Sequence, residues 1–188
     1  LIKDLMLNIK PYKTIYIGGG TPSSLELPVL SKLLKKINEL FNVSELEEFT
    51  IEVNPEDINV ELIECLKKYN VNRVSIGIQT FHKRLCKYLG RFSDYDDIKT
   101  KISLLKEYGF HNINIDLMYG ISNESIKELE EDIDMMISLD VSHISTYSLI
   151  LEEKTILYHQ FQKGLFSLSN EDEERIMYDL IIEKLTNN

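Results

Sequence analysis

The sequence has 188 residues, of which 43% are hydrophobic and 28% are charged, values typical of one globular domain with its own core. A formal net charge of −10 and the lack of a basic patch argue against nucleic acid as the main partner. The sequence contains no run of about 18 apolar residues, so no membrane span is indicated. The start at residues 1–4, Leu-Ile-Lys-Asp without Met, favours an amphipathic helix inside a larger protein and indicates no signal peptide.

Two cysteines, Cys65 and Cys86, are too few for a disulfide framework, and their spacing fits no zinc site. Cys65 lies on the apolar side of its segment, where a thiol acts as a small buried hydrophobic group. We therefore expect a reducing compartment and place the protein in the cytoplasm, with an organelle as the alternative if a targeting segment precedes this sequence. Two acidic runs, residues 128–132 and 171–174, are predicted to be solvated faces or first turns of helices.

Short β-branched segments alternate with longer segments of helical period along the chain. The predicted strands are Thr14–Gly18, Glu48–Val53, Arg73–Ile78, Asn112–Asp116 and His143–Leu149. The predicted helices are Leu27–Phe41, Val60–Tyr69, Tyr95–Tyr108, Ser125–Leu139 and a last one over Glu171–Leu185. Asn59 is expected to cap the second helix, and Asn123 or Ser125 the fourth. The alternation predicts an α/β fold with parallel strands and right-handed crossovers.

The later predicted strands each have one aliphatic face and one face of small or polar residues. An ordinary (β/α) barrel fills its interior with bulky branched side chains, whereas this pattern predicts a roomy, hydrophilic interior that holds a polar ligand. The largest polar groups, Glu52, Gln79, Asp116 and Tyr147, fall late in their strands, at the end where parallel α/β proteins form their sites. We predict a ligand site there; the alternative is that these groups only bind nearby loop amides.

A glycine run follows the first strand, in the segment Tyr-Ile-Gly-Gly-Gly-Thr-Pro-Ser at residues 16–23. Glycine permits positive φ and lets a ligand approach the main chain closely. A dinucleotide fingerprint would need glycine at position 23, which is Ser23, and a P-loop would need Gly-Lys-Ser/Thr. Taken alone, the run is compatible with a plain tight turn as well as with a binding loop.

In its context this segment resembles the glycine motif of radical S-adenosylmethionine (SAM) enzymes. Further segments of that kind follow in order: Ile-Glu-Val-Asn-Pro at 51–55, Asn-Arg-Val-Ser-Ile-Gly-Ile-Gln-Thr-Phe at 72–81, Leu-Gly-Arg at 89–91, Asn-Ile-Asp-Leu-Met-Tyr-Gly at 114–120 and His-Ile-Ser-Thr-Tyr at 143–147. Together they resemble the oxygen-independent coproporphyrinogen III oxidase superfamily, especially its haem-chaperone branch, over roughly residues 13–185.

The resemblance implies a partial, TIM-like (β/α) radical SAM core over residues 1–165 and a helix that begins a C-terminal region over 166–188. It implies that the methionine end of SAM is lined by Gly19, Gly20 and Thr21. The implied polar contacts to SAM are Glu52, Gln79, Arg91 and Asp116, and the implied adenine contact is Ile150. These residue types suit SAM, because carboxylates accept hydrogen bonds from ammonium and ribose hydroxyl groups and arginine can clamp a carboxylate.

The sequence also departs from the family. The Cys-x3-Cys-x2-Cys loop that binds a [4Fe–4S] cluster is absent and is expected upstream of residue 1, and the C-terminal lid is missing. The family's Tyr-Gly-Leu-Pro-Gly-Gln-Thr reads Tyr-Gly-Ile-Ser-Asn-Glu-Ser at 119–125, and Ser93 stands where a His is frequent. This chain alone is therefore not expected to cleave SAM.

The resemblance leads us to expect the SAM-binding core of a haem-chaperone-like protein, which binds haem and passes it to an accepting protein. One alternative is a true oxidase, in which a 5′-deoxyadenosyl radical abstracts hydrogen from a coproporphyrinogen propionate. Another is a degenerate relative that keeps the fold without activity. The sequences at 75–81 and 89–91 favour the chaperone branch.

Overall fold

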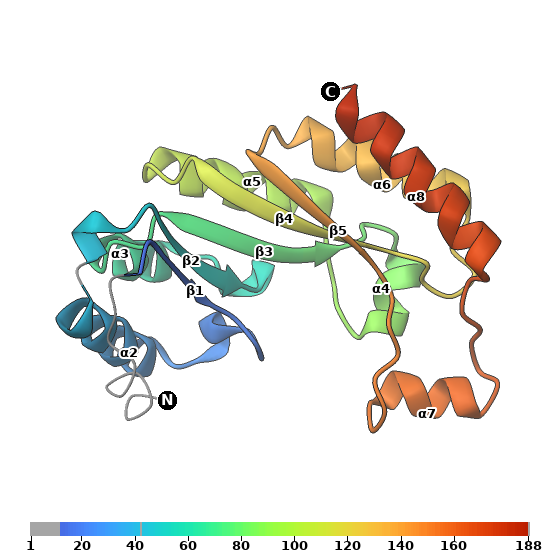
Figure 1. The fold of residues 1–188 in the computed structure, drawn as a ribbon, viewed down its shortest axis with the longest axis horizontal. Coiled ribbons are helices and arrows are strands. Elements are labelled where there is room, and N and C mark those ends of the chain that lie inside the picture. The colour runs from blue at the N-terminus through green and yellow to red at the C-terminus, as the bar shows by residue number, and fades with distance from the viewer. Residues whose placement is uncertain (1–11, 42, 188) are drawn as a thin grey trace. The chain divides into compact units, whose positions relative to one another are not determined.

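The computed structural model describes residues 12–41 and 43–187, so the helix expected at the N-terminus lies outside the described part of the chain. The strands are β1 (Thr14–Ile17), β2 (Glu48–Val53), β3 (Arg73–Gln79), β4 (Asn112–Tyr119) and β5 (His143–Ser148). They form one sheet in the order of the chain, and both β1 with β2 and β2 with β3 pair in parallel (Figure 1). The predicted α/β class and all five predicted strands are confirmed.

The helices include all five that the sequence predicts. They are α2 (Leu27–Leu40), α3 (Val60–Lys68), α5 (Tyr95–Glu107), α6 (Ile126–Ser138) and α8 (Glu171–Thr186). Two short helices, α4 (Lys83–Leu89) and α7 (Ile156–Gln162), were not predicted. Short 3-10 turns occupy Pro22–Ser24, Val43–Glu45 and Pro55–Asp57.

The chain divides into two compact units. One, called the N-terminal unit, runs up to Gly77 and includes Thr100–Asn114. The other, called the C-terminal unit, consists of Ile78–Lys99 and the chain from Ile115 onward. The boundary passes through β3 and β4, so each unit contains part of these two strands.

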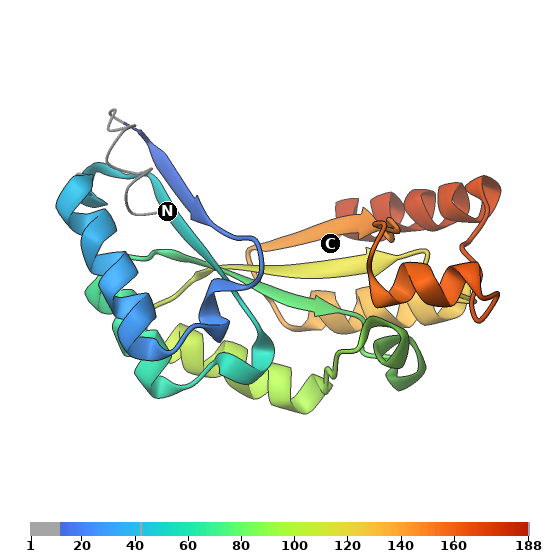
Figure 2. The same cartoon turned by 90° about the horizontal axis from the view of Figure 1, so that it is seen from below.

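In the N-terminal unit, Phe49, Ile51 and Val53 of β2 are buried in the core, whereas Ile15 and Ile17 of β1 are half-buried. The buried stripe of α2 consists of Leu30, Leu33, Leu34 and Ile37, at the spacing that the sequence predicts. Helix α2 packs beside α3 (Figure 2), which starts at the predicted cap, where the side chain of Asn59 accepts the N–H of Leu62 over 2.8 Å. The glycine run begins at the end of β1 and precedes α2 in the chain.

In the C-terminal unit, α6 and α8 pack along each other (Figure 1). Met177 and Ile181 are the buried residues of α8. Lys184 of α8 forms ion pairs with Glu130 and Asp134 of α6. The capping box of α6 is formed by Ser125 and Glu128, as one of the two predicted alternatives. The acidic run at 171–174 forms the first turn of α8, as predicted.

The polar side of the strands is only partly open. Thr50, Ser75 and Asn114 are buried, and the Asn114 amide donates to the Ser75 hydroxyl over 2.8 Å. The Thr50 hydroxyl donates to Oε1 of Glu48 over 2.7 Å, so these three polar side chains find their partners within the protein.

The prediction that Asp116 comes late in its strand is wrong. Strand β4 continues through Leu117, which is fully buried, to Tyr119, so Asp116 is mid-strand.

Candidate functional site

The glycine loop, residues 18–21, leaves the end of β1 and is held by Glu52 of the neighbouring strand β2. The Tyr16 hydroxyl donates to Oε1 of Glu52 over 2.8 Å, and the main-chain N–H of Gly19 donates to Oε2 over 3.0 Å. The parallel register of β1 and β2, which pairs Ile17 with Ile51, brings the two strand ends together. Glu52 therefore holds the loop in two ways: it binds the main-chain N–H of Gly19, and it binds the side chain of Tyr16 on the preceding strand.

The three glycines are needed for two different physical reasons. A Cβ on Gly18 would lie 2.6 Å from Oε1 of Glu52 and from the Tyr16 ring, so only glycine leaves room for that carboxylate. Gly19 and Gly20 have φ of +79° and +68°, and a Cβ on either would meet nothing within 4 Å. The main chain at these two glycines is thus open to a ligand.

Thr21 closes the loop in an unusual backbone conformation. Its φ of 46° is rare for a β-branched residue, and strain of this kind clusters at ligand sites. The next turn is held by Ser23, whose hydroxyl donates to Asp57 over 2.5 Å and accepts the N–H of Asn54 over 2.9 Å. The loop is consequently fixed on both sides of its open glycines.

A second group of predicted residues surrounds a cavity in the C-terminal unit. The cavity has a volume of about 720 Å³. Its lining includes Gln79, Arg91, Met118, Tyr147, Ile150 and Ile156. Ile150 is 78% exposed, so an apolar surface faces this space without cover from the protein. Polar and apolar groups together suit a nucleoside-like ligand.

Gln79 is the most constrained residue of the cavity lining. It ends β3 with φ of 74° and is only 5% exposed. The Tyr147 hydroxyl donates to Oε1 of Gln79 over 2.7 Å. Ser93, which replaces the family's His, donates its hydroxyl to the carbonyl of Ile78 over 3.0 Å and so ties the segment after Arg91 to the end of β3.

Each unit thus brings together its own subset of the predicted site. The N-terminal unit joins Glu52 to the glycine loop, and the C-terminal unit places three predicted residues around one cavity. Asp116 belongs to the C-terminal unit, is partly buried and does not line that cavity, so its role stays a prediction. Tyr147 had no assigned role, although its place near the end of a strand was the signal that pointed to it.

The prediction that the acidic run at 128–132 is a solvated face or first turn is wrong for Asp132. This residue is 0% exposed. Its carboxylate accepts the Thr80 hydroxyl over 2.6 Å and the main-chain N–H of Phe81 over 2.8 Å. The helical period explains the burial, because Asp132 shares the inner side of α6 with Leu129 and Ile133.

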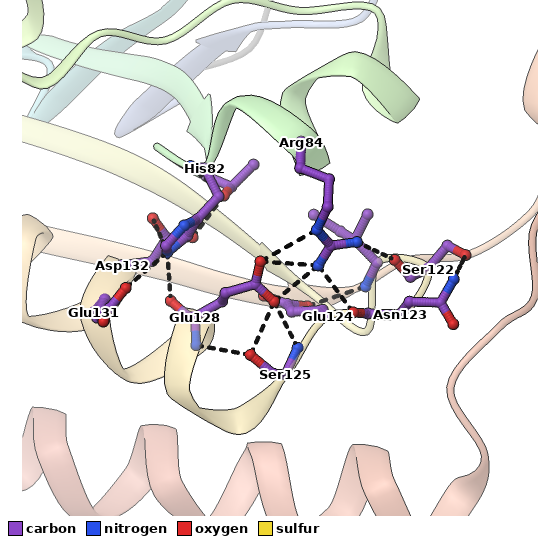
Figure 3. A network of polar contacts seen from close by, with 11 residues as sticks. His82, Arg84, Ser122, Asn123, Glu124, Ser125, Glu128, Glu131 and Asp132 are labelled. Atoms are coloured by element: carbon purple, nitrogen blue, oxygen red, sulfur yellow. Dashed lines mark hydrogen bonds and ion pairs between the residues drawn. The ribbon is translucent and has the colours of Figure 1, made fainter.

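Arg84 of α4 connects this helix to the loop after β4. Its guanidinium donates to both carboxylate oxygens of Glu128 over 2.8 Å, and to the carbonyl oxygens of Ser122 over 3.3 Å and Asn123 over 2.9 Å (Figure 3). Burial alone raises the pKa of Glu128, but the hydrogen bonds from Arg84 and Ser125 and the charge of Arg84 bring it down to about 2. Glu128 is therefore a firmly ionised partner.

The loop itself shows how the departure from the family motif is accommodated. Asn123 has φ of 54°, a conformation that Asn tolerates better than most residues and that suits the family's Gly at this position. Glu124 is 7% exposed; its Oε2 accepts the N–H of Ile121 over 3.0 Å, and its Oε1 is buried without a hydrogen bond in the described part of the chain. Burial raises the pKa of Glu124 to about 8, so it is a neutral acid at pH 7.

We call Thr80, Arg84, Glu124, Glu128 and Asp132 the loop–helix network. The carboxylates of Glu128 and Asp132 both accept hydrogen bonds from protein donors, so these two groups join segments of the chain.

The comparisons with known proteins identify the family. The family model of the radical SAM superfamily matches residues 1–136. The chain belongs to the radical SAM superfamily. It is 42% identical over 174 residues to the heme chaperone HemW of Bacillus subtilis, covering 92% of this chain and 46% of that protein. It is 39% identical over 180 residues to HemW of Lactococcus lactis, covering 96% and 48%. The chain thus spans about half the length of the curated relatives it matches.

Solved structures agree on the fold. Coproporphyrinogen III oxidase (HemN) from Escherichia coli superimposes with a TM-score of 0.80 and 26% identity, over 93% of this chain and 40% of that one. Streptococcus suis SuiB bound to S-adenosylmethionine superimposes with a TM-score of 0.65 at 18% identity, over 93% and 37%. The predicted TIM-like radical SAM fold is confirmed.

Membership of the superfamily implies SAM and a [4Fe–4S] cluster as cofactors. SAM suits the residues present, because the open glycines and the partly exposed carboxylate of Glu52 leave main-chain and carboxylate groups for a ligand. The cluster does not: the sequence has two cysteines, both buried, and no group of three possible metal ligands occurs among residues 12–41 and 43–187. No helix in the same ranges is long and apolar enough to cross a membrane.

Proposed function

We propose that this chain is the SAM-binding core of a haem-chaperone-like radical SAM protein that binds haem and passes it to an accepting protein. The observation that carries the proposal is the 42% identity with a curated haem chaperone over 92% of this chain. In this proposal residues 1–165 belong to the core, residues 166–188 begin a C-terminal region, and the protein works in the cytoplasm. The cysteines of the [4Fe–4S] cluster belong to a part of the protein outside this sequence.

The two residue groups have different tasks in the proposed site. Gly19, Gly20 and Thr21 receive the methionine end of SAM through their main chain, and Glu52 accepts hydrogen bonds from its ammonium group while holding the loop. The remaining contacts come from Gln79, Arg91, Asp116 and Ile150. SAM and a reduced cluster supply radical chemistry when bound, and the residues of this chain bind and orient the ligand.

The oxidase remains a second candidate, because the superposition on coproporphyrinogen III oxidase has a TM-score of 0.80. One experiment separates the two. The full-length protein that contains this chain is reconstituted anaerobically with its cluster and titrated with haem, and then incubated with SAM, a reductant and coproporphyrinogen III. Stoichiometric haem binding without protoporphyrinogen supports the chaperone. Formation of protoporphyrinogen makes the protein an oxidase, and binding of neither SAM nor haem makes it a degenerate relative.

The residues of the proposed site are tested in the same preparation. We expect Glu52→Gln to weaken SAM binding by about tenfold, since the amide keeps the size of the side chain but removes its charge. Isothermal titration with SAM measures the effect, and Glu56→Gln, on the following turn, serves as the matched control. Equal SAM affinity in Glu52→Gln and the wild type would remove Glu52 from the site.

A further inference from the structure

We propose that Tyr147 is a positioning residue that orients the amide of Gln79, so that the amide NH2 group faces the ligand as a donor. The proposal rests on the proposed SAM site and adds to it a residue with no assigned role. It begins from the 2.7 Å hydrogen bond between the two side chains.

The backbone of Gln79 indicates why its side chain needs a partner. A φ of 74° is uncommon for a residue that is neither glycine, asparagine nor aspartate, and it costs free energy that the surroundings must supply. Ser93 restrains the preceding residue by donating to the carbonyl of Ile78. The main chain at the end of β3 is therefore held in one conformation, and only the rotation of the Gln79 side chain remains to be set.

The chemistry of an amide makes this rotation decisive. The two ends of the Gln79 amide have opposite roles, because its oxygen accepts hydrogen bonds and its NH2 group donates them. The Tyr147 hydroxyl donates to the oxygen, so the NH2 group is the end left to meet a ligand atom that only accepts, such as a carboxylate oxygen. Rotated by half a turn, the amide would present an acceptor instead and would change which ligand atoms it can bind.

The placement of Tyr147 supports a role at the cavity over a role in packing. It is 39% exposed and lines the cavity together with Gln79, whereas a tyrosine that served the core would be largely buried. Tyr147 lies on β5 and Gln79 on β3, with β4 between them in the sheet. The bond therefore bridges two strands that do not pair, and sheet formation does not require it.

The test is a double-mutant cycle on SAM affinity in the cluster-reconstituted full-length protein. We expect Tyr147→Phe to weaken SAM binding about fivefold, the size of one neutral hydrogen bond, and Gln79→Ala to weaken it about tenfold or more. Because Tyr147 acts through Gln79, the double variant should bind SAM no more weakly than Gln79→Ala alone. Gln79→Glu should also lose affinity, since a carboxylate still accepts from Tyr147 but cannot donate to SAM.

Tyr95→Phe is the matched control. It removes another phenol hydrogen bond of the C-terminal unit, between Tyr95 and Ser138 over 2.6 Å, and Tyr95 does not line the cavity. Its SAM affinity should equal that of the wild type. Circular dichroism and thermal unfolding of each variant confirm that the fold is retained.

Three outcomes would overturn the proposal. Additive losses in the double variant would mean that Tyr147 acts independently of Gln79. Unchanged affinity in Tyr147→Phe, with reduced affinity in Gln79→Ala, would remove its positioning role while leaving the SAM site intact. Unchanged affinity in both Gln79→Ala and Glu52→Gln would instead remove the proposed SAM site itself, and the positioning role with it.

Discussion

The glycine loop and the loop–helix network both use a carboxylate to bind a main-chain N–H, but with opposite results. Glu52 holds the N–H of Gly19 and remains partly exposed. Asp132 holds the N–H of Phe81 and is completely buried. Exposure therefore distinguishes a carboxylate that can also serve a ligand from one that only joins two segments of the chain.

The energetic reason lies in hydration. A buried carboxylate loses its water and is tolerated only when protein donors replace it, as Thr80 and Phe81 do for Asp132. Each carboxylate oxygen can accept more than one hydrogen bond, so Glu52, still in contact with water, keeps acceptor sites for a ligand. Four variants test this contrast, beginning with the largest expected effect.

Asp132→Ala should destabilise the protein by about 3 kcal/mol, because it leaves the hydroxyl of Thr80 and the N–H of Phe81 buried without their acceptor. Urea unfolding measures the loss. The matched control is Glu131→Ala on the exposed side of the same helix, for which we expect a change below about 1 kcal/mol. Similar values for the two variants would show that burial does not separate these acids.

Glu124→Gln should stabilise the protein by about 2 kcal/mol at pH 8, because the amide keeps the neutral form that burial demands. The folded-state pKa of about 8 lies above the ordinary 4.5, so the contribution of Glu124 to stability is most favourable below pH 4.5 and is lost as the pH rises toward 8. Unfolding measured from pH 5 to pH 9 should show this slope in the wild type and a weaker slope in the variant. Parallel pH profiles would mean that Glu124 is ionised in the folded protein.

Gly18→Ala should weaken SAM binding in the full-length protein, because its Cβ would force Glu52 from its place beside the loop. We expect a loss of about 1 to 2 kcal/mol in stability, similar to that of Gly20→Ala, whose cost comes from positive φ alone. Comparing the two by titration and unfolding separates the need for space from the need for conformation. A Gly18→Ala protein with normal SAM affinity would contradict the role of Glu52.

Arg84→Ala should cost about 1 kcal/mol at pH 7, since the ion pair with Glu128 is partly exposed. The pKa of Glu128 should rise from about 2 toward its ordinary 4.5, which NMR titration can follow. The folded-state pKa is lowered in the wild type, so the stability from this pair is complete above pH 4.5 and disappears as the pH falls toward 2. An unchanged Glu128 pKa in the variant would exclude Arg84 as its cause.

The sequence predicts the long elements well, because their apolar periodicity is local information. Helix α4 was not predicted because it is only seven residues long and begins with two cations, Lys83 and Arg84. Positive charge is unfavourable at the N-terminus of a helix. Helix α7 is also only seven residues long and buries no residue, although the cap at Thr155 was a usable signal.

Only those residues of the candidate site that lie in a recognisable motif or at a strand end could be predicted from the sequence. The glycine run marks the loop directly, and the strand ends mark Glu52 and Gln79. The burial of Asp132 could not be seen, because its partner Thr80 lies 52 residues away and nothing local distinguishes Asp132 from its solvated neighbours. The bond between Tyr147 and Gln79, 68 residues apart, depends on tertiary structure in the same way.

The two cysteines have a practical consequence for cluster chemistry. Both thiols are buried, and burial raises the pKa of each, which keeps them protonated and poor at binding iron or reacting with alkylating reagents. Cys86 is further engaged by the carbonyl of Thr80 over 3.3 Å. The folded full-length protein can be treated with iron and sulfide or with iodoacetamide. Cys65 and Cys86 should then bind almost no iron and take up almost no label, so the iron or label that is retained reports on cysteines elsewhere in the protein.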